Sequence, residues 1–285
     1  MLILHHNDLD GRAAAAVILN SNLRQYERQI DCVEMNYDRP VPWDRIEPEE
    51  TVWITDFSLS PEDMRKLLTI TKTVVWIDHH RTAIDKFKDF ETPVEGLRHD
   101  GLSGCVLTWL YLNRLGVKDV DKVPLGVRLI GDFDCWTFNK PGGFGRRAEE
   151  FYFGMMAGDN GPEAEVWLLL RDDNEVEPIQ GRGRTIMAYR QQFFRDYLKS
   201  WGYEIQFEGH RCLAVCCAQT GSGSFDSRKA DDFDILISYV HSNRGYAVSL
   251  YTLHTDRIDV SAICKKHGGG GHRGASGFQC QKLPW

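Results

Sequence analysis

Three short apolar runs near the start of the chain are each followed at once by acidic or imidazole side chains. The runs at 2–4, 52–55 and 73–77 have the length and composition of buried β-strands. The segments that follow them are His-Asn-Asp-Leu-Asp at 6–10, Asp56, and Asp-His-His at 78–80. Because the carboxyl ends of the strands in an open α/β sheet line one crevice, we expect these side chains to lie close together.

Helix signals alternate with strand signals from the start of the chain to about residue 135. The segment 11–20 is rich in alanine, which has the highest helix propensity. A second helix is predicted from Pro61, because Ser60 is a suitable N-cap and proline is favoured at the first helical position. A third is predicted from Ser103 to Leu115. This alternation predicts a parallel sheet in an α/β domain.

The pattern changes in the second half of the chain. Residues 149–171 are predicted to be helical, and an amphipathic helix over 179–202 is predicted to link two domains. Strand-like runs then predominate and precede a short helix near 258–267. We therefore divide the chain into a parallel-sheet domain at 1–178, the helical linker, and a smaller α/β domain at 203–285.

The composition is that of a globular protein, with 42% hydrophobic and 26% charged residues in a chain of 285. No apolar stretch approaches the ~20 residues of a membrane span, so no membrane partner is expected. The eight cysteines include no Cys-x-x-Cys pair, which favours buried thiols and a cytoplasmic location. The net charge of −7 and the lack of a long basic stripe favour a short phosphate substrate over a long nucleic-acid strand.

The first polar segment alternates His6, Asp8 and Asp10 with other residues. If the strand geometry continues through this segment, all three side chains face the same side. The alternative is an acidic turn in which an aspartate caps a helix. A mixed set of carboxylates and imidazoles suits Mn²⁺, and two such ions a few ångström apart are a standard device for breaking phosphate esters.

The third polar segment is a stronger signal than Asp56, which alone could simply cap a loop. Burying Asp78 together with His79 and His80 costs several kcal/mol unless the groups are paired or bound to metal. The alternative is a hydrogen-bonded Asp–His pair.

A further ligand is expected after the apolar run at 127–131. That run is followed by Asp132 and Asp134. We prefer Asp132 as the ligand, with Asp134 as the substitute.

Near the C-terminus, the segment 268–277 contains six glycines. Successive glycines allow positive φ and close backbone approach, and their N–H groups can form an anion-binding concavity. His272 and Arg273 add donors for phosphate. We therefore predict a glycine-rich phosphate-binding loop that includes Gly269, Gly270, Gly271, His272 and Arg273. The alternative is a flexible linker, but a strand-like segment follows at 275–280.

Together these motifs resemble those of the DHH/DHHA1 phosphoesterase superfamily. They are HNDLDG at 6–11, TDFS at 55–58, DHH at 78–80, GDFD at 131–134 and GGGGHRGASGF at 268–278. The superfamily includes single-strand exonucleases of the RecJ type, nano-RNases and cyclic-dinucleotide phosphodiesterases. The resemblance covers nearly the whole chain and implies a DHH catalytic domain followed by a DHHA1 substrate-binding domain.

The resemblance also implies two Mn²⁺ ions, for which Mg²⁺ or Co²⁺ are possible substitutes. One ion would be held by His6, Asp8 and Asp56. The other would be held by Asp10, Asp56, His79 and Asp132, so that Asp56 bridges the two. Asp78 would orient a histidine, His80 would lie near the scissile phosphate, and water activated by the two ions would attack phosphorus.

One departure from the family pattern concerns substrate binding. Many members carry Ser-x-Arg before the glycine signature, and that arginine grips phosphate. Here the stretch is Ser249-Leu250-Tyr251, with tyrosine in place of arginine. Arg244, Arg257 and Arg273 are the candidates to replace it. Ser103 and Arg244 are also assigned to substrate binding.

The resulting expectation is a Mn²⁺-dependent phosphodiesterase that hydrolyses short oligonucleotides or linear dinucleotides to mononucleotides. The alternatives are a RecJ-like exonuclease on longer strands, a cyclic-dinucleotide phosphodiesterase or pyrophosphatase-like hydrolase, and a non-enzymatic nucleotide-binding sensor. The choice between RNA and DNA and the presence of a homodimer stay open at this point.

Overall fold

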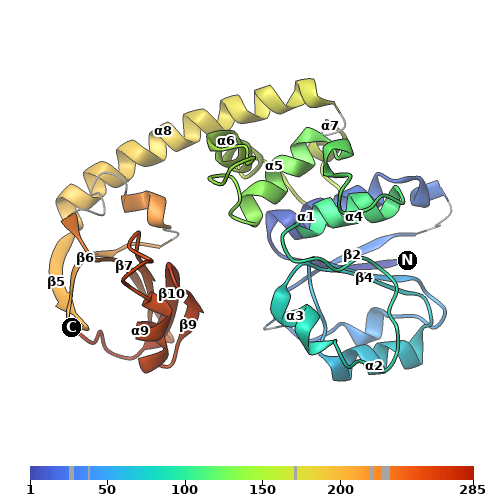
Figure 1. The fold of residues 1–285 in the computed structure, drawn as a ribbon, viewed down its shortest axis with the longest axis horizontal. Helices are drawn as coiled ribbons and strands as arrows, with labels where there is room; N and C mark the ends of the chain where they lie inside the picture. The colour runs from blue at the N-terminus through green and yellow to red at the C-terminus, as the bar shows by residue number, and fades with distance from the viewer. Residues whose placement is uncertain (26–28, 38, 170–171, 219–220, 226–231) are drawn as a thin grey trace. The chain divides into compact units, whose positions relative to one another are not determined.

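The computed structural model describes residues 1–25, 29–37, 39–169, 172–218, 221–225 and 232–285 (Figure 1). The chain forms two compact units, Met1–Ile186 and Met187–Trp285. The division falls inside the long helix α8 (Val176–Trp201), which covers most of the segment predicted as a linker.

The first unit contains a four-stranded parallel sheet in the order β2-β1-β3-β4. Its strands are β1 (Leu2–His6), β2 (Asp31–Met35), β3 (Val52–Thr55) and β4 (Val74–Ile77). In the central register, Leu4 lies beside Ile54 and Ile54 beside Trp76. Strands buried on both faces read as continuous apolar runs, which is why the sequence pattern located β1, β3 and β4.

Alternate residues of these strands face two apolar layers. One layer joins Leu4 and Ile54 to Met64 and Leu67 of α2, and the other joins Ile3 and Trp53 to Ile18 and Leu107. Helices α1 and α4 therefore cover one face of the sheet, and α2 and α3 the other (Figure 1). The helices are α1 (Leu9–Leu19), α2 (Pro61–Ile70), α3 (Arg81–Lys86), α4 (Gly104–Leu112), α5 (Leu125–Asp134), α6 (Arg146–Met155) and α7 (Val166–Leu169). Short 3₁₀ turns lie at Asn22–Gln25, Trp43–Arg45, Val120–Lys122 and Asp173–Glu175.

Two helix predictions for this unit need comment. The cap of α2 is as expected, because the Ser60 hydroxyl accepts a hydrogen bond from the backbone N–H of Asp63 at 3.0 Å. The single helix predicted over 149–171 is wrong, because the structure has α6 and α7 with a break between them. Glycine and proline at 158–162 interrupt the helix. Residues 170 and 171 of that prediction lie outside the described part of the chain.

The second unit contains a six-stranded sheet in the order β5-β6-β7-β8-β10-β9. Its strands are β5 (Tyr203–Phe207), β6 (His210–Cys216), β7 (Ile235–Ser242), β8 (Gly245–Tyr251), β9 (Gly270–His272) and β10 (Ala275–Cys280). Strands β6 and β7 run parallel, and the other neighbours run antiparallel. Helix α9 (Val260–Lys266) packs on one face, Leu198 of α8 packs on the other, and a 3₁₀ turn lies at Ser222–Phe225.

The glycine-rich segment is not the loop that the sequence predicted. Gly270 to His272 form the edge strand β9, which pairs antiparallel with β10. A side chain at position 269 would place its Cβ 2.1 Å from the carbonyl oxygen of Gly277, so glycine is needed there for close approach of the two backbones. The glycines thus serve first to build a tight hairpin.

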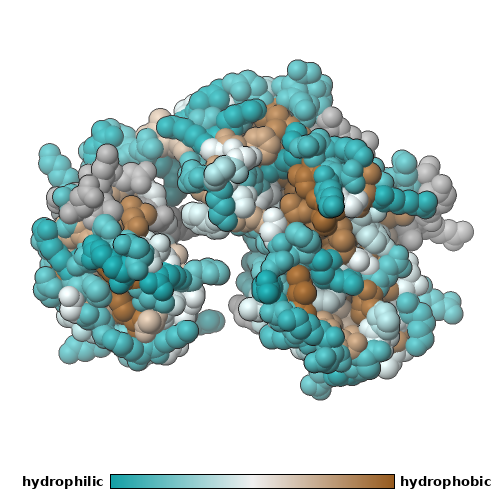
Figure 2. All heavy atoms as spheres, viewed as in Figure 1, coloured by the Kyte–Doolittle hydropathy of each residue, from teal (hydrophilic) through white to brown (hydrophobic). Residues whose placement is uncertain are grey.

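The surface of both units is mostly hydrophilic, and apolar residues gather in limited patches on the face shown in Figure 2. Among the described helices, none combines the length and apolar character that a membrane span requires.

Candidate metal centre

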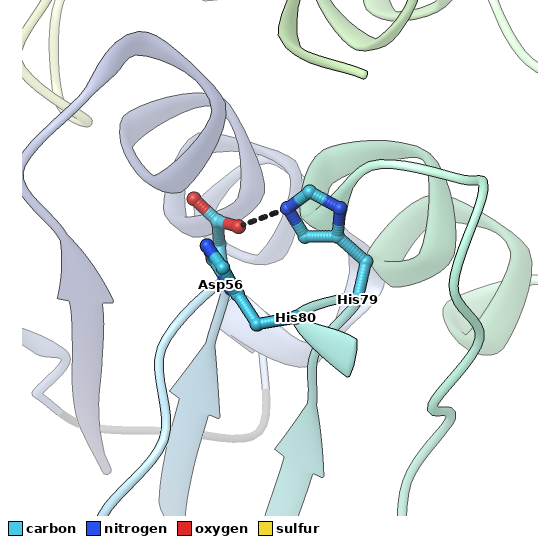
Figure 3. Close-up of side chains that lie close together, drawn as sticks. All are labelled: Asp56, His79 and His80. Atoms are coloured by element: carbon cyan, nitrogen blue, oxygen red, sulfur yellow. Dashed lines mark ion pairs between the residues drawn. The ribbon is translucent and has the colours of Figure 1, made fainter. Parts of the chain in front are cut away.

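The candidate site lies at the carboxyl ends of β1, β3 and β4. Asp56 follows β3 directly and adopts a positive φ of 53°, which is unusual for a residue with a side chain. His79 and His80 follow β4 after one residue, and Figure 3 shows Asp56 and both histidines grouped together. Backbone strain of this kind persists where surrounding structure enforces it, often at functional sites.

The Asp56 carboxylate is the centre of the group. It is 1% exposed, and neither oxygen has a hydrogen-bond partner among the described residues. The nearest basic groups are the imidazoles of His79, with Nε2 3.1 Å from Oδ1, and His6, with Nδ1 3.7 Å from Oδ2. Burial, followed by the charges of Asp10 and Asp8, raises the pKa of Asp56 well above its ordinary value. A buried carboxylate whose oxygens receive no hydrogen bond and face imidazole rings is suited to bind a cation.

Helix α4 begins directly against this carboxylate. A Cβ at Gly104 would lie 2.5 Å from Cβ and 2.9 Å from Cγ of Asp56. Non-bonded carbon atoms do not approach this closely, so only glycine allows α4 to begin at this position. The same helix start donates its backbone N–H groups to Asp10, as described below.

His6 and Asp8 form one side of the site. Nδ1 of His6 lies 2.7 Å from Oδ2 of Asp8, while Oδ1 of Asp8 accepts a hydrogen bond from the N–H of Gly11 and caps α1. Burial alone would raise the pKa of Asp8, but the hydrogen bond with His6 and the charge on that ring lower the pKa to about 2. Asp8 therefore stays ionised, with Oδ1 capping α1 as the alternative interpretation expected and Oδ2 lying beside His6.

Asp10 does not continue the alternation that the sequence suggested. The chain turns into α1 at Leu9, so Asp10 lies in the first helical turn. Its two oxygens accept hydrogen bonds from the N–H groups of Gly104 at 2.6 Å and Cys105 at 3.0 Å. The expectation of strand geometry through this segment is wrong. Asp10 anchors α4 and adds negative charge near Asp56, which it reaches electrostatically.

The DHH segment contains the hydrogen-bonded Asp–His pair that was one of the two alternatives left open by the sequence. Asp78 is fully buried, and its Oδ1 accepts hydrogen bonds from the backbone N–H groups of His79 and His80 and lies 2.8 Å from Nδ1 of His80. This hydrogen bond raises the pKa of His80. Asp78 therefore orients His80, whereas His79 faces Asp56. Burial is the main cause of the lowered pKa of His79.

The structure places Asp134, not Asp132, beside the histidines. Oδ2 of Asp134 lies 3.4 Å from Nε2 of His79. Asp132 instead accepts hydrogen bonds from the N–H of Phe144 at 2.6 Å and from the hydroxyl of Thr137. The preference for Asp132 is corrected on this geometry. Both residues lie in the last turn of α5, where neighbours two apart point in nearly opposite directions.

Burial and the charges of Asp10 and Asp8 raise the pKa of Asp134 well above its ordinary value. The sulfur of the next residue, Cys135, is 3.8 Å from Nδ1 of His79. The sequence did not single out Cys135. Helical periodicity over 125–134 indicates that Asp132 and Asp134 point in different directions, but not which of them reaches His79.

Three groups of potential ligand atoms occur among the described residues. They are His6–Asp8–Asp56, Asp56–His79–His80 and His79–Asp134–Cys135, each with its ligand atoms within 4.8 Å of one another. The groups share Asp56 and His79, so they form one continuous cluster. Carboxylate and imidazole donors fit a divalent cation such as Mn²⁺, Mg²⁺ or Zn²⁺.

The predicted substrate contacts are more dispersed than the ligands. Ser103 is 1% exposed, and its hydroxyl lies beside the Cys105 sulfur and would be 2.5 Å from a Cβ at Gly131. It is therefore a packing residue at the start of α4 and does not meet solvent in this structure. The prediction that it contacts substrate is not supported.

In the second unit, His272 and Arg273 lie at the turn between β9 and β10. Arg273 donates to the carbonyl of Thr255 and pairs with Asp259 at 3.6 Å, whereas His272 is exposed. Arg244 lies in the β7–β8 turn, at the Cys280 end of β10, while the β9–β10 turn lies at its Ala275 end. The structure therefore does not bring Arg244 together with the glycine-rich hairpin. Tyr251, in the position of the family arginine, packs near Phe225 with ring centroids 6.3 Å apart.

Comparison with known proteins gives two relatives in sequence, and no family model matches the chain. Protein R106 of Acanthamoeba polyphaga mimivirus is 25% identical over 242 residues, which are 80% of this chain and 53% of that protein. Oligoribonuclease NrnB of Bacillus subtilis is 25% identical over 296 aligned positions, which are 95% of this chain and 71% of NrnB. The chain thus spans about half the length of the viral relative.

Solved structures share the fold over almost the whole chain. The DHH domain of a member of the S1p family of ribosomal proteins has a TM-score of 0.53 at 14% identity, covering 98% of this chain and 82% of that one. The pGpG-specific phosphodiesterase PggH from Vibrio cholerae has 0.51 at 14%, covering 98% and 92%. Exonuclease RecJ bound to manganese has 0.50 at 15%, covering 98% and 85%.

The fold and the site define an α/β protein with a DHH-type domain, whose acidic and imidazole side chains gather at the carboxyl edge of a parallel sheet. The chain is thus similar in sequence to an oligoribonuclease, and it shares its fold with a DHH domain, a phosphodiesterase and an exonuclease.

Proposed function

We propose that the protein is a phosphodiesterase that uses two divalent cations, Mn²⁺ foremost, to hydrolyse short oligonucleotides or linear dinucleotides to mononucleotides. The observation that carries the proposal is Asp56. Its carboxylate is buried, has two oxygens without hydrogen-bond partners among the described residues, and lies between two sets of ligand-type side chains. Burying such a group without a partner is costly, and cations held by its oxygens would offset that cost.

The residues present fit two cations. His6, Asp8 and Asp56 would hold one, and Asp56, His79 and Asp134 would hold the other. When bound, such cations neutralise phosphate charge and provide a nucleophile from water at neutral pH. The set differs from the one that the resemblance implied, in that Asp134 replaces Asp132. Asp10 is not a ligand in this set, and it instead fixes the start of α4 through hydrogen bonds.

His80 is assigned to the substrate side of the site. Asp78 holds its Nδ1, so Nε2 is the ring nitrogen that remains to meet a ligand, and the ring is about one third exposed. The raised pKa of His80, caused first by the Asp78 hydrogen bond, favours the protonated ring. A protonated imidazole donates to a phosphate oxygen and offsets its charge.

The proposal of a short nucleotide substrate has two supports. The relative NrnB is named an oligoribonuclease and the structural neighbour PggH a pGpG-specific phosphodiesterase. The two units also differ in charge. Residues 187–285 carry twelve Lys/Arg against nine Asp/Glu, although the whole chain has a net charge of −7. The acidic first unit suits cations, and the mildly basic second unit suits a small phosphate ligand better than a long strand.

The test uses metal-stripped protein and a labelled length series from dinucleotide to long single strands, with Mn²⁺ or Mg²⁺ added back. Metal-dependent cleavage that is fastest on the shortest substrates is expected. A rate that rises with strand length would favour the RecJ-like exonuclease, and absence of metal-dependent cleavage on every substrate would reject the phosphodiesterase. The Asp56→Asn variant serves as the inactive control.

A further inference from the structure

Two exposed aromatic side chains stand out in the first unit. Among its described residues, Tyr37 at 58% and Trp136 at 66% are the large aromatic side chains that are mostly exposed to solvent. An exposed aromatic ring beside a ligand site offers a face on which a nucleobase can stack. Both are adjacent to residues of the metal centre.

Tyr37 packs beside His6 and His80 at one edge of the centre. It follows β2, and its ring centroid lies 5.9 Å from that of His6, 6.5 Å from that of His80 and 4.8 Å from that of Phe57. Phe57 is buried and supports the tyrosine from below. The tyrosine ring therefore lies at the edge of the centre, next to His6 and His80, and part of it stays exposed to solvent.

Trp136 lies next in the chain to the part of the centre formed by His79, Asp134 and Cys135. It follows Cys135 directly, whose sulfur is 3.8 Å from His79, and Asp134 precedes both. Its backbone has a positive φ of 54°, a conformation that is rare for a bulky residue. Phe133 and Phe138 support the indole with ring centroids at 6.3 and 5.7 Å.

We propose that Tyr37 and Trp136 are stacking platforms for the two nucleobases that flank the scissile phosphate, one at the His6–His80 edge of the centre and one next to its His79–Asp134 edge. The proposal rests on the proposed function and makes it more specific. A phosphate bound at the centre would have a base within reach of an aromatic face on each side, so the favoured substrate carries a base on both. Pyrophosphate and polyphosphate have no group for either ring.

Stacking on an aromatic ring is tolerant of base identity, because every base has a π-face. The platforms therefore select for a dinucleotide unit without strong sequence preference. The loss of one base contact, at ~1–3 kcal/mol, corresponds to a roughly 5- to 150-fold change in kcat/KM.

The experiment compares three linear dinucleotides: the intact molecule, one that lacks the 5′ base and one that lacks the 3′ base. Wild-type protein should prefer the intact molecule by roughly 5- to 150-fold over each abasic one. Tyr37→Ala should lose the preference for one base and Trp136→Ala the preference for the other, with the loss chiefly in KM. Tyr37→Phe and Trp136→Phe should keep most of it, because they retain a ring.

The matched control is Trp201→Ala, which removes an equally exposed indole (67%) from α8 in the other unit. It should keep both base preferences. Calorimetric titration with Mn²⁺ should give the same affinity for wild type, Tyr37→Ala and Trp136→Ala, since neither ring is a ligand. A changed Mn²⁺ affinity would show that the rings only support the metal centre, and this would overturn the proposal.

Failure of this inference differs from failure of the proposed function. If no dinucleotide is cleaved with any metal, the phosphodiesterase proposal fails, and dissociation constants of the same three ligands still test the platforms. If wild type cleaves or binds intact and abasic dinucleotides equally well, the stacking proposal fails while the phosphodiesterase proposal stands.

Discussion

Replacing Asp56 by asparagine should make the metal-free protein more stable while removing its response to metal. Asp56→Asn keeps the shape of the side chain and removes its charge. In the structure both carboxylate oxygens are buried without hydrogen-bond partners among the described residues, and Asp8, Asp10 and Asp134 lie near enough to raise its pKa. Each unsatisfied buried polar group costs about 1–3 kcal/mol. A neutral amide avoids the charge repulsion and can donate to a neighbouring carboxylate.

We expect a gain of roughly 1–3 kcal/mol in the free energy of unfolding without metal, which for a unit of this size raises the melting temperature by roughly 2–10 °C. Adding Mn²⁺ reverses the order. A ligand at 100 times its dissociation constant adds about 2.7 kcal/mol to the protein that binds it, and the variant lacks the shared ligand. The two melting curves should therefore exchange order between chelator and excess Mn²⁺, as measured by differential scanning calorimetry.

The pH dependence of the free energy of unfolding provides a second test of Asp56→Asn. Because the folded-state pKa of Asp56 is raised, the folded protein holds a proton that the unfolded chain has already released above about pH 4. Stability of metal-free wild type should therefore fall as the pH rises from that value through the folded-state pKa, by up to ~1.4 kcal/mol per pH unit. The variant should show a shallower slope. The reasoning is refuted if Asp56→Asn is less stable without metal, or if Mn²⁺ raises both melting temperatures equally.

Three further changes test the rest of the site. Asp134→Asn should abolish the Mn²⁺-induced rise in melting temperature. Asp132→Asn should keep that rise and lower the free energy of unfolding by about 1–2 kcal/mol, because it disturbs the hydrogen bond from the Phe144 N–H. The opposite pattern would restore Asp132 as the ligand. Gly104→Ala should weaken Mn²⁺ binding by displacing Asp56. The control Gly158→Ala, whose Cβ would have no atom within 4 Å, should leave Mn²⁺ binding unchanged. Equal Mn²⁺ affinities of the two variants in calorimetric titrations would contradict the close-approach argument. His272→Ala should raise KM for a dinucleotide and leave kcat nearly unchanged, as steady-state kinetics would show; an unaltered KM would remove this histidine from substrate binding.

The sequence was informative wherever burial imposes a pattern on it. Strands β1, β3 and β4 are buried on both faces, so each appears as an unbroken apolar run, and the polar residue at its end marks the edge of the sheet. Strand β2 is an edge strand of mostly half-buried residues, and its sequence accordingly mixes polar and apolar residues. The convergence of Asp56 and His79 follows from strand order and was therefore predictable.

What the sequence did not show depends on rotation and on backbone partners. Asp132 and Asp134 are equivalent as letters, and only the helical geometry of α5 sends one to His79 and the other to Phe144. Asp10 looked like a ligand because the donors that occupy it come from a helix start almost a hundred residues later. The glycine-rich hairpin was misread for a similar reason, since the pairing of β9 with β10 is a tertiary contact.

The carboxylates of the centre divide according to what their oxygens contact, and this division explains how the site can exist before a cation arrives. Asp10 holds the start of α4, and Asp78 holds the DHH turn, through backbone N–H groups. These two fix the framework. Asp56 and Asp134 receive no such backbone bonds in the described residues, and their pKa values are raised. The framework thus holds two poorly solvated carboxylates together beside His79, and a divalent cation bound there would offset their repulsion.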